Sequence, residues 1–424
     1  MRTLLFLATA LLAQADPVLE KIVAHVQSHP TGDAPFSFNL NTTSTDLANL
    51  PIGVFDSGIG GLTVLEEIFK IDAFHNDTLA PGPDGHPDFE NERFIYFGDQ
   101  ANMPYGNYSA ENNLPYLREL ILKDALFLLG NRHDTSDPAS PGPQPKPSVK
   151  ALVIACNTAT AYGLEDLRAL IKELNLPIFV VGVVEAGARG LLTAPEDGSV
   201  AVFATVGTCA SGAYPKAIQS TRGLAGRPAA TITQHGSPAL AGVIEGDPAF
   251  TTSLADQITA DVKSLVDTHR KTHPNGPPLQ KIILGCTHFP LAQKDIDSAF
   301  ATVRKDPAYT PHIATTLTYV NPAEWTAKEL FRSLASARLR HKPGTPFVTE
   351  KDLFFLSVPN PQFPGIQLTE TGALDHAYKY RRQSGHLDRQ DTLNIPMTPE
   401  KLPPTSRHLI ESRLPATWSR LVHP

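Results

Sequence analysis

Short apolar runs that end abruptly at a small or polar residue recur along this 424-residue chain. Each run has the length of a strand, and apolar residues at helical spacing follow the first of them at Leu62, Leu65 and Phe69. The runs that we predict to be strands are 52–55, 94–97, 151–154, 178–184, 200–204 and 282–284. Strands that alternate with helices favour an α/β fold of the doubly wound type, with mainly parallel sheets.

Two of these runs end at a cysteine, and the surroundings of the two cysteines are alike. One run ends at Cys156-Asn157-Thr158 and the other, 130 positions later, at Cys286-Thr287-His288. The chain has three cysteines in all, so the matching contexts of two of them indicate a shared role. Two thiols that face each other across a pocket can remove a proton from one face of a carbon atom and return one to the other face.

The residues that follow the predicted strands form a candidate site. In open α/β sheets, ligands bind beyond the carboxyl ends of the strands. Asp56, Cys156, Glu245, Cys286 and His288 lie at such ends or in the loops after them. Helix N-termini at these points bind carboxylates and lower the pKa of a thiol toward the reactive thiolate. We therefore expect Asp56 and His288 to be proton partners of the two sulfurs.

Other chemistries fit the sequence less well. The glycine-rich turn 58–61 lacks the spacing of a nucleotide-binding loop. Cys156, Cys286 and His288 have no second close pair of ligands, so we predict no metal site. Cys209 has no acid–base neighbour in the sequence and is interpreted as structural. A cysteine at a strand end can also be simply a small buried apolar residue, which is the structural alternative for the other two.

Bulk properties exclude some partners. The net charge of −7, from 36 basic and 43 acidic residues, and the absence of a basic stripe argue against a nucleic-acid partner. Residues 1–15 have the order of a secretory signal peptide, with Arg2, the apolar run 4–12 and a small-residue cleavage pattern. That run is shorter than the ~20 residues that span a bilayer, and no other stretch predicts a membrane span. We therefore predict export to the periplasm; a cytoplasmic protein with an apolar N-terminal helix or a misassigned start codon is the alternative.

Six segments of the chain together resemble the motifs of the glutamate racemases, within the aspartate/glutamate racemase superfamily. They occur in the order expected for that family and cover roughly residues 52–335. The segments are 52–65, 98–106, 153–160, 182–188, 207–215 and 284–291.

The resemblance implies a cofactor-independent transfer of a proton at the α-carbon of glutamate. By motif match, Cys156 and Cys286 are the two bases, Asp56 is the acid paired with the first cysteine, and His288 is the histidine near the second. The positions that match substrate contacts are Ser57, Pro104, Tyr105, Gly106, Asn157, Thr158 and Thr287, and two further matches, both tentative, are Glu245 and Thr208. Glu245 stands where the family has two glutamates, so its assignment is the weaker one.

The family architecture implies two similar doubly wound domains with the active site in the cleft between them. The expected division is a signal peptide at 1–15, an N-terminal extension at 16–50, a first domain at 51–182 plus 291–340, a second domain at 183–290, and a C-terminal extension of unknown role at 341–424. Two segments rich in proline and glycine, near 75–92 and 133–148, are predicted to be surface insertions in the first domain.

We predict that the chain is an amino-acid racemase that interconverts L-glutamate and D-glutamate and supplies D-glutamate for peptidoglycan. One alternative is a racemase for aspartate or a related acid. Another is an exported, non-catalytic binder of acidic amino acids or cell-wall peptides, which would bind glutamate without exchanging its α-hydrogen. The sequence leaves the oligomeric state open, with a homodimer as one option.

Overall fold

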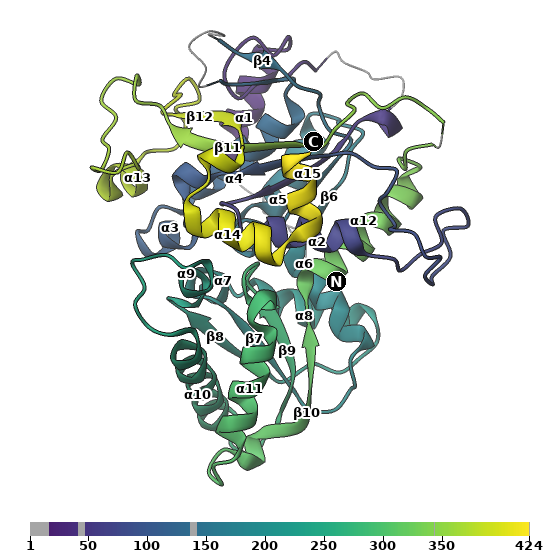
Figure 1. Cartoon of the computed structure of the whole chain (residues 1–424), viewed down its shortest axis with the longest axis vertical. Coiled ribbons are helices and arrows are strands. Elements are labelled where there is room, and N and C mark those ends of the chain that lie inside the picture. Colours follow the sequence, from purple (N-terminus) through teal and green to yellow (C-terminus); the bar gives the residue numbers. More distant parts are fainter. Residues whose placement is uncertain (1–16, 41–46, 136–141, 343, 424) are drawn as a thin grey trace, which may run out of the picture.

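The computed structural model describes residues 17–40, 47–135, 142–342 and 344–423. Within these residues the chain forms two lobes, one above the other in Figure 1, and each is built on its own sheet. The predicted α/β fold with mainly parallel sheets is confirmed. The expected signal peptide at 1–15 lies outside the described residues.

The sheet of the first lobe has six strands in the order β12-β11-β2-β1-β5-β6. All neighbouring pairs are parallel except β11 and β12, which are antiparallel. The strands, in sheet order, are Thr392–Pro396, Leu353–Pro359, Phe94–Gly98, Ile52–Asp56, Ala151–Ile154 and Val180–Gly182. The central strands β1, β2 and β5 are buried at every residue, which is typical of a parallel sheet covered on both faces.

The sheet of the second lobe has four parallel strands in the order β10-β9-β7-β8. They are Ile313–Val320, Leu279–Gly285, Ser199–Thr205 and Ile232–Ser237. A separate two-stranded ribbon, β3 and β4, lies in the second predicted insertion, at Arg132–His133 and Gln144–Pro145.

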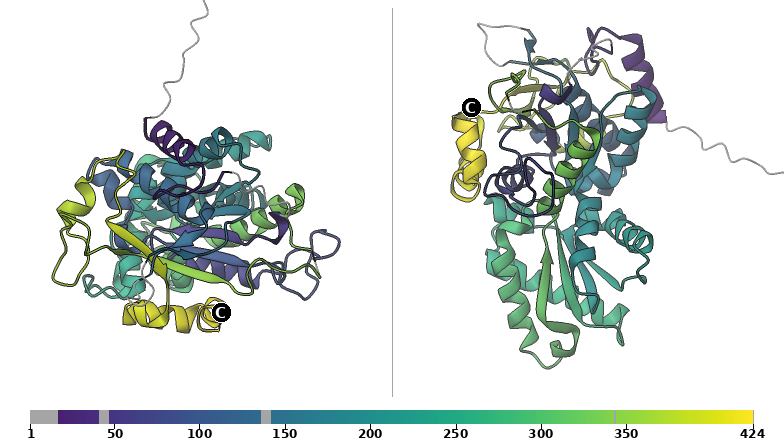
Figure 2. Two further views of the ribbon diagram at one scale, coloured as in Figure 1. Left: turned by 90° about the horizontal axis from the view of Figure 1, so that it is seen from above. Right: turned by 90° about the vertical axis from the view of Figure 1, so that its right-hand side faces the viewer.

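Helices surround both sheets and cover the junction between them (Figures 1 and 2). The α-helices are α1 (Pro17–Ser28), α2 (Leu62–Lys70), α3 (Gly106–Ala110), α4 (Leu114–Leu129), α5 (Asn157–Glu173), α6 (Val183–Gly190), α7 (Val206–Ala210), α8 (Ala213–Leu224), α9 (Leu240–Glu245), α10 (Leu254–Thr272), α11 (Gln293–Arg304), α12 (Pro322–Ala337), α13 (His376–Arg381), α14 (Pro404–Arg413) and α15 (Pro415–Val422). Short 3₁₀ turns are η1 (Leu47–Asn49), η2 (Gln100–Asn102), η3 (Leu191–Thr193), η4 (Phe289–Ala292), η5 (Thr310–His312) and η6 (Pro399–Lys401).

The structure differs from two sequence-based boundaries. Residues 291–340 were expected to return to the first domain, but β10 pairs with β9 and α11 packs on α10, so residues 293–320 belong to the second lobe, whereas α12 packs on α2 of the first lobe and on α6. The apolar run 178–184 was expected to be one strand, but the strand is limited to Val180–Gly182 and helix α6 begins at Val183. Val183 and Val184 are buried as part of this helix, and a short apolar run alone does not distinguish the two structures.

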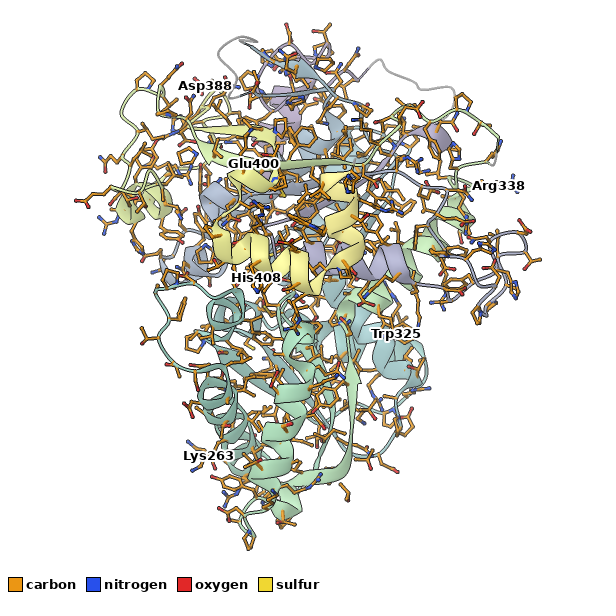
Figure 3. All side chains as sticks on the ribbon, in the orientation of Figure 1. Lys263, Trp325, Arg338, Asp388, Glu400 and His408 are labelled. Carbon is orange, nitrogen blue, oxygen red and sulfur yellow. The ribbon has the colours of Figure 1, made fainter. Side chains whose placement is uncertain are left out.

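Apolar side chains form one continuous core that joins the lobes. The cluster includes Val54 of β1 and Val202 of β7, together with Leu330 of α12. Helix α12 packs against both α2 and α6, and the ring of Trp325 packs against Gly190 of α6. Figure 3 shows Trp325 at the level where the two lobes meet. The lobes therefore share a core rather than being joined by a bare linker.

The C-terminal extension wraps around the first lobe and continues to the junction. It adds β11 beside β2 and β12 at the sheet edge. Helix α14 then lies near the junction of the lobes, and α15 turns back over the first lobe, where it packs on α2 (Figure 1). Ile410, Leu414 and Leu421 of this helix pair belong to the shared core. The extension, whose role the sequence left open, is thus part of the folded body.

The first predicted insertion forms no helix or strand between Ile71 and Arg93. Most of it is exposed, but Phe74 stacks on Phe331 of α12 with ring centroids 4.3 Å apart, and Phe89 is buried beside the same ring. These rings anchor the insertion to the body. Across the described ranges, no helix combines the length and the apolar character needed to cross a membrane.

Candidate active site

Cys156 and Asp56 lie side by side at the carboxyl ends of adjacent strands. Asp56 is the last residue of β1, and Cys156 follows β5 as the N-cap of α5. The Cys156 sulfur accepts a hydrogen bond from the Ala159 N–H at 3.4 Å and lies 3.6 Å from Ser57 Oγ. Asp56 Oδ2 accepts hydrogen bonds from the N–H groups of Gly58 and Gly61, at 3.2 and 3.0 Å.

The environment of this pair favours the protonated forms. Burial raises the pKa of the Cys156 thiol above its ordinary value, and the nearby charge of Asp56 raises it further. Burial also raises the pKa of Asp56, although the two backbone N–H groups oppose this. A thiol beside a carboxylate holds its proton more firmly than a free thiol, so Cys156 is protonated at neutral pH and is the cysteine that has a proton to transfer.

The second cysteine has a different neighbour. Cys286 follows β9, and its sulfur lies 4.0 Å from Nδ1 of His288. The other ring nitrogen, Nε2, lies 3.6 Å from Oε2 of Glu245, the last residue of α9. Burial by itself lowers the pKa of His288, but hydrogen bonding and charge at Cys286, with the charges of Glu245 and Asp56, outweigh it and raise the pKa to about 9. His288 is therefore a cation at neutral pH.

Two buried tyrosines connect the two halves of the site. The Tyr96 hydroxyl donates to the carbonyl of Gly58 at 2.6 Å, and burial, followed by the charges of Asp56, Cys156 and Glu245, raises its pKa far above the ordinary value. Groups from both lobes thus act on one hydroxyl group. Tyr214 donates a hydrogen bond to Asn157 Oδ1 at 2.7 Å, and its ring packs against Gly285, the residue before Cys286.

Hydrogen bonds across the junction surround the two sulfurs. Thr63 Oγ1 of α2 donates to the carbonyl of Thr287 at 2.7 Å, and the hydroxyls of Thr158 and Thr208 lie 3.2 Å apart. A Cβ at Gly60 would lie 2.5 Å from Thr287 Oγ1, so only glycine fits there. Cys156 and Cys286 are each 6% exposed to solvent. In this arrangement, the predicted positions Ser57, Asn157, Thr158, Thr208 and Thr287 all lie at the junction with the two cysteines.

The segment Pro104-Tyr105-Gly106 is placed differently from the expectation for Tyr105. Its hydroxyl lies in the first lobe, 2.6 Å from Asp99 Oδ2 and 2.7 Å from Asp124 Oδ2, and the side chain is buried. Burial, and then the charge of Asp99, raises the pKa of Asp124 well above its ordinary value, which lets the two carboxyl groups share one hydroxyl. A ligand contact at Tyr105 would therefore come from the main chain.

Gly106, by contrast, reaches the junction. A Cβ at Gly207 of the second lobe would lie 2.7 Å from Gly106 Cα, so the two backbones meet closely at this point. Glycine at position 207 permits that approach, because a side chain there would collide with the backbone of Gly106.

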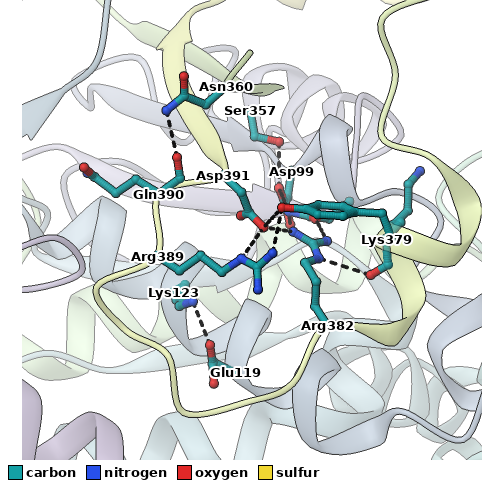
Figure 4. Close-up of polar contacts among 12 residues, drawn as sticks. Asp99, Glu119, Lys123, Ser357, Asn360, Lys379, Arg382, Arg389, Gln390 and Asp391 are labelled. Carbon is teal, nitrogen blue, oxygen red and sulfur yellow. Dashed lines mark hydrogen bonds and ion pairs between the residues drawn. The ribbon is translucent and has the colours of Figure 1, made fainter. Parts of the chain in front are cut away.

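Side chains of the C-terminal extension contact residues 99–106, the segment that contains Pro104-Tyr105-Gly106 (Figure 4). Ser357 of β11 donates to Asp99 Oδ1 at 2.6 Å, and Arg382 donates to Asn102 and pairs with Asp391 at 3.2 Å. Lys379 Nζ donates to the carbonyl of Met103 at 2.8 Å. Residues 99–106 are thus held in place by side chains of the extension.

Cys209 is separate from this group. Burial raises its pKa to about 12, and no acidic or basic side chain contributes to the shift. Within the described residues, no group of three or more His, Cys, Asp or Glu side chains could hold a metal ion.

Sequence reasoning missed three contributors to the site. Tyr96 lies in a strand that was read as purely apolar, although a buried hydroxyl in such a strand needs a hydrogen-bond partner and could have been noticed for that reason. Tyr214 lies within a motif segment but was not singled out. Ser406, which donates to Glu245 at 3.1 Å, lies in the C-terminal extension, and no local pattern indicates its partner.

Comparisons with known proteins identify one family. The family model described as Asp/Glu/Hydantoin racemase matches residues 142–320. The chain is 33% identical over 251 residues to the glutamate racemase of Enterococcus faecalis, which is 59% of this chain and 71% of that protein. It is 32% identical over 262 residues to the glutamate racemase of Lactobacillus johnsonii, covering 61% of this chain and 77% of that protein.

A solved structure is similar as well. The crystal structure of glutamate racemase isoform RacE1 from Bacillus anthracis superimposes with a TM-score of 0.50 at 28% sequence identity. The match covers 73% of this chain and 89% of that chain.

Proposed function

Since this chain belongs to the glutamate racemase family and is an amino-acid racemase, we propose that it interconverts L- and D-glutamate through two cysteines, Cys156 and Cys286, without a cofactor. The observation that carries the proposal is the pair of thiols at the junction of the lobes with partners of opposite charge, Asp56 beside one and His288 beside the other. Names of the relatives support glutamate as the substrate.

In the proposed reaction, the α-carbon of glutamate lies between the two sulfurs. The Cys286 thiolate, stabilised by the His288 imidazolium, removes the α-proton from one face. The Cys156 thiol donates its proton to the opposite face, which gives the other enantiomer. The two thiols have then exchanged protonation states, and after product release the Cys286 thiol loses a proton to water while the Cys156 thiolate gains one, which restores the starting state. The buried polar surroundings stabilise the negative charge that develops on the substrate.

The hydroxyl and amide groups at the junction are the proposed substrate contacts. Ser57, Asn157, Thr158 and Thr287 flank the two cysteines, and the N-terminus of α5 offers backbone N–H groups to a carboxylate. We assign Pro104 and Gly106 to the same pocket through their main chain, with Thr208 as a partner of Thr158. Glutamate reaches the sulfurs only when the hydrogen bonds across the junction open, since both cysteines are buried.

We also propose that the product D-glutamate serves peptidoglycan synthesis and that the protein is exported. The support for export is the signal-peptide pattern of residues 1–15. Export would place the catalytic thiols in an oxidising compartment, where they must stay reduced to act. Cell fractionation, with mass spectrometry of the mature N-terminus, tests this part: an N-terminus at Met1 in the cytoplasmic fraction would refute it.

The racemase proposal is tested by α-hydrogen exchange in heavy water. Purified protein in reducing buffer, with no added cofactor, should incorporate deuterium into both enantiomers of glutamate and equalise their amounts. The panel includes both enantiomers of aspartate, because faster turnover of aspartate would reassign the substrate. Cys209→Ser is the matched control and should keep full activity, since Cys209 has no acid–base partner. Tight binding of glutamate without exchange would contradict the proposal.

A further inference from the structure

The carboxylate nearest His288 has a partner from outside the family match. Ser406, on α14 of the C-terminal extension, donates its hydroxyl hydrogen to Glu245 Oε1 at 3.1 Å. Ser406 is buried and lies 161 positions from Glu245 in the sequence, beyond the residues 142–320 that match the family model. We propose that Ser406 is a positioning residue of the racemase, which holds Glu245 toward His288 and so maintains the charge pair of His288 and Cys286.

The two oxygens of Glu245 have separate partners. Oε1 accepts from Ser406, and Oε2 lies 3.6 Å from Nε2 of His288. That nitrogen is buried and has no hydrogen-bond partner among the described residues, so the charge of Glu245 is its close electrostatic contact. A rotation of the carboxylate would remove this contact. The hydroxyl of Ser406 fixes the rotation by occupying the other oxygen.

The position of Glu245 explains why such a partner is needed. Glu245 ends helix α9, and the C-terminal end of a helix carries a partial negative charge that repels a carboxylate. A donated hydrogen bond on one side and the His288 cation on the other offset this repulsion. Gly246 then turns the chain away with φ of 74°, which leaves the space that α14 occupies beside Thr405.

Helix α14 is held in place without the help of Ser406. Ile410 and Leu414 are buried in the shared core, and Arg413 donates to the carbonyl of Leu291, in the turn that follows His288. Figure 3 places His408 of the same helix at the junction of the lobes. Loss of a single hydroxyl at position 406 should therefore leave the helix docked while it frees Glu245.

The test compares Ser406→Ala with Ser412→Ala, a matched control. Ser412 lies on the same helix, and its exposed hydroxyl bonds only to the carbonyl of His408 at 2.7 Å. We expect Ser406→Ala to lower kcat/KM roughly five- to tenfold, equally for both enantiomers because the equilibrium constant of racemisation is one. Ser412→Ala should keep the wild-type value, and both variants should remain folded at the assay temperature, as a single cooperative melting transition above it shows.

A second readout is independent of turnover. Iodoacetamide alkylates thiolates, and mass spectrometry resolves the labelling rates of the individual cysteines. At pH 7, Ser406→Ala should slow labelling of Cys286 several-fold and leave that of Cys156 unchanged. The titratable groups that act on His288 are Cys286, Glu245 and, from the first lobe, Asp56, with Tyr96 facing Glu245. Of these, Ser406 bonds to Glu245 alone, so Ser406→Ala should have no further effect on labelling in a Glu245→Gln background.

The outcomes separate this role from simple packing and from the proposed function on which it rests. The role of Ser406 would be overturned if alkylation slowed equally at both cysteines. An equal loss of kcat/KM in Ser412→Ala would also overturn it, as would an additive effect on alkylation in the Glu245→Gln background. The wild-type protein could fail to exchange the α-hydrogen of glutamate while Ser406→Ala still slows the alkylation of Cys286 alone. In that case the proposed function fails and the positioning role of Ser406 stands.

Discussion

The two thiols lie at corresponding points of the two lobes, each after a central strand, but their surroundings differ in charge. Cys156 is next to a buried carboxylate, Asp56, from its own sheet. Cys286 is next to a histidine that is a cation at neutral pH, and this histidine is supported by Glu245 and, through it, by the C-terminal extension. The two thiols therefore have neighbours of opposite charge.

This difference gives the two sides complementary roles. A two-base racemase needs one protonated and one deprotonated thiol at the start of each turnover, and two identical environments would not supply them. In the proposed mechanism, the opposite charges of the neighbours favour this starting state before the substrate arrives. The predictions below test the asymmetry, from the largest expected effect to the smallest.

The first prediction concerns the thiols themselves. Cys156→Ser and Cys286→Ser should each lower racemisation by at least about 10³-fold, since each removes a group that transfers a proton. Each variant keeps one thiol, so slow deuterium exchange should persist for one enantiomer only, and for opposite enantiomers in the two variants. Chiral chromatography with mass spectrometry measures this. Exchange of the same enantiomer in both variants would contradict the assignment of the thiols to opposite faces.

The second prediction exchanges the charged neighbours for neutral ones. Asp56→Asn removes the negative charge that raises the pKa of Cys156, so alkylation of Cys156 by iodoacetamide at pH 8 should become faster. His288→Asn removes the cation beside Cys286, so alkylation of that cysteine should become slower. Racemisation should fall in both variants, by roughly 10²-fold for a lost acid–base partner. If the alkylation rates of the two cysteines changed in the same direction, the two thiols would have similar electrostatic surroundings.

The third prediction concerns the upper pH limit of activity, which His288 beside Cys286 should set. The pKa of His288 is raised from its ordinary 6.5 to about 9, so the imidazolium persists well above pH 6.5 and is lost as the pH rises through about 9. Its contribution to the stability of the fold is complete below pH 6.5, the ordinary value that holds in the unfolded chain. The kcat/KM of the wild type should decline over that upper range. The stabilisation of the fold by His288 should be lost over the same range. The free energy of unfolding, measured with urea from pH 6 to 10, should therefore fall more steeply in the wild type than in His288→Asn. Identical pH profiles of the two proteins would contradict the raised pKa.

The smallest effect is expected at the tyrosine that touches both sides. Tyr214→Phe removes the hydrogen bond to Asn157 while the ring stays against Gly285. We expect a loss of about 1–2 kcal/mol in the free energy of unfolding, because Asn157 Oδ1 loses a buried donor. Activity should fall a few-fold with an unchanged pH profile. Tyr319→Phe is the control: its hydroxyl bonds to Asp297 at the surface, away from the sulfurs, and its activity should equal that of the wild type.

Local patterns in the sequence predicted much of the fold and the places where the site residues would lie. The apolar runs marked β1, β2, β5, β7 and β9. Asp56 ends β1, and Cys156 and Cys286 follow β5 and β9. This worked because the carboxyl ends of parallel strands meet at one edge, so that residues far apart in the sequence converge.

Contacts that depend on tertiary packing could not be predicted. Glu66 lies among the apolar residues of α2 and gives no local signal, yet its buried carboxylate accepts the N–H groups of Ala416 and Thr417 at the start of α15. Ser406 is one of many polar residues in a tail without clear periodicity. Tyr105 was assigned by motif, and its hydroxyl points to Asp99 and Asp124 because these buried carboxyl groups need a donor.

Strand β11 has a practical consequence for the design of shortened proteins. It covers the open side of β2 along Ile95, Tyr96 and Phe97, and β12 in turn forms the outer border with Pro396 at its end. A fragment that ends at residue 340, before the C-terminal extension, would lack β11 and leave the apolar strand β2 with an unpaired backbone edge. Exposed strands of that kind pair with other copies and aggregate. Insolubility of such a fragment would therefore report the loss of an edge strand, not the absence of a racemase.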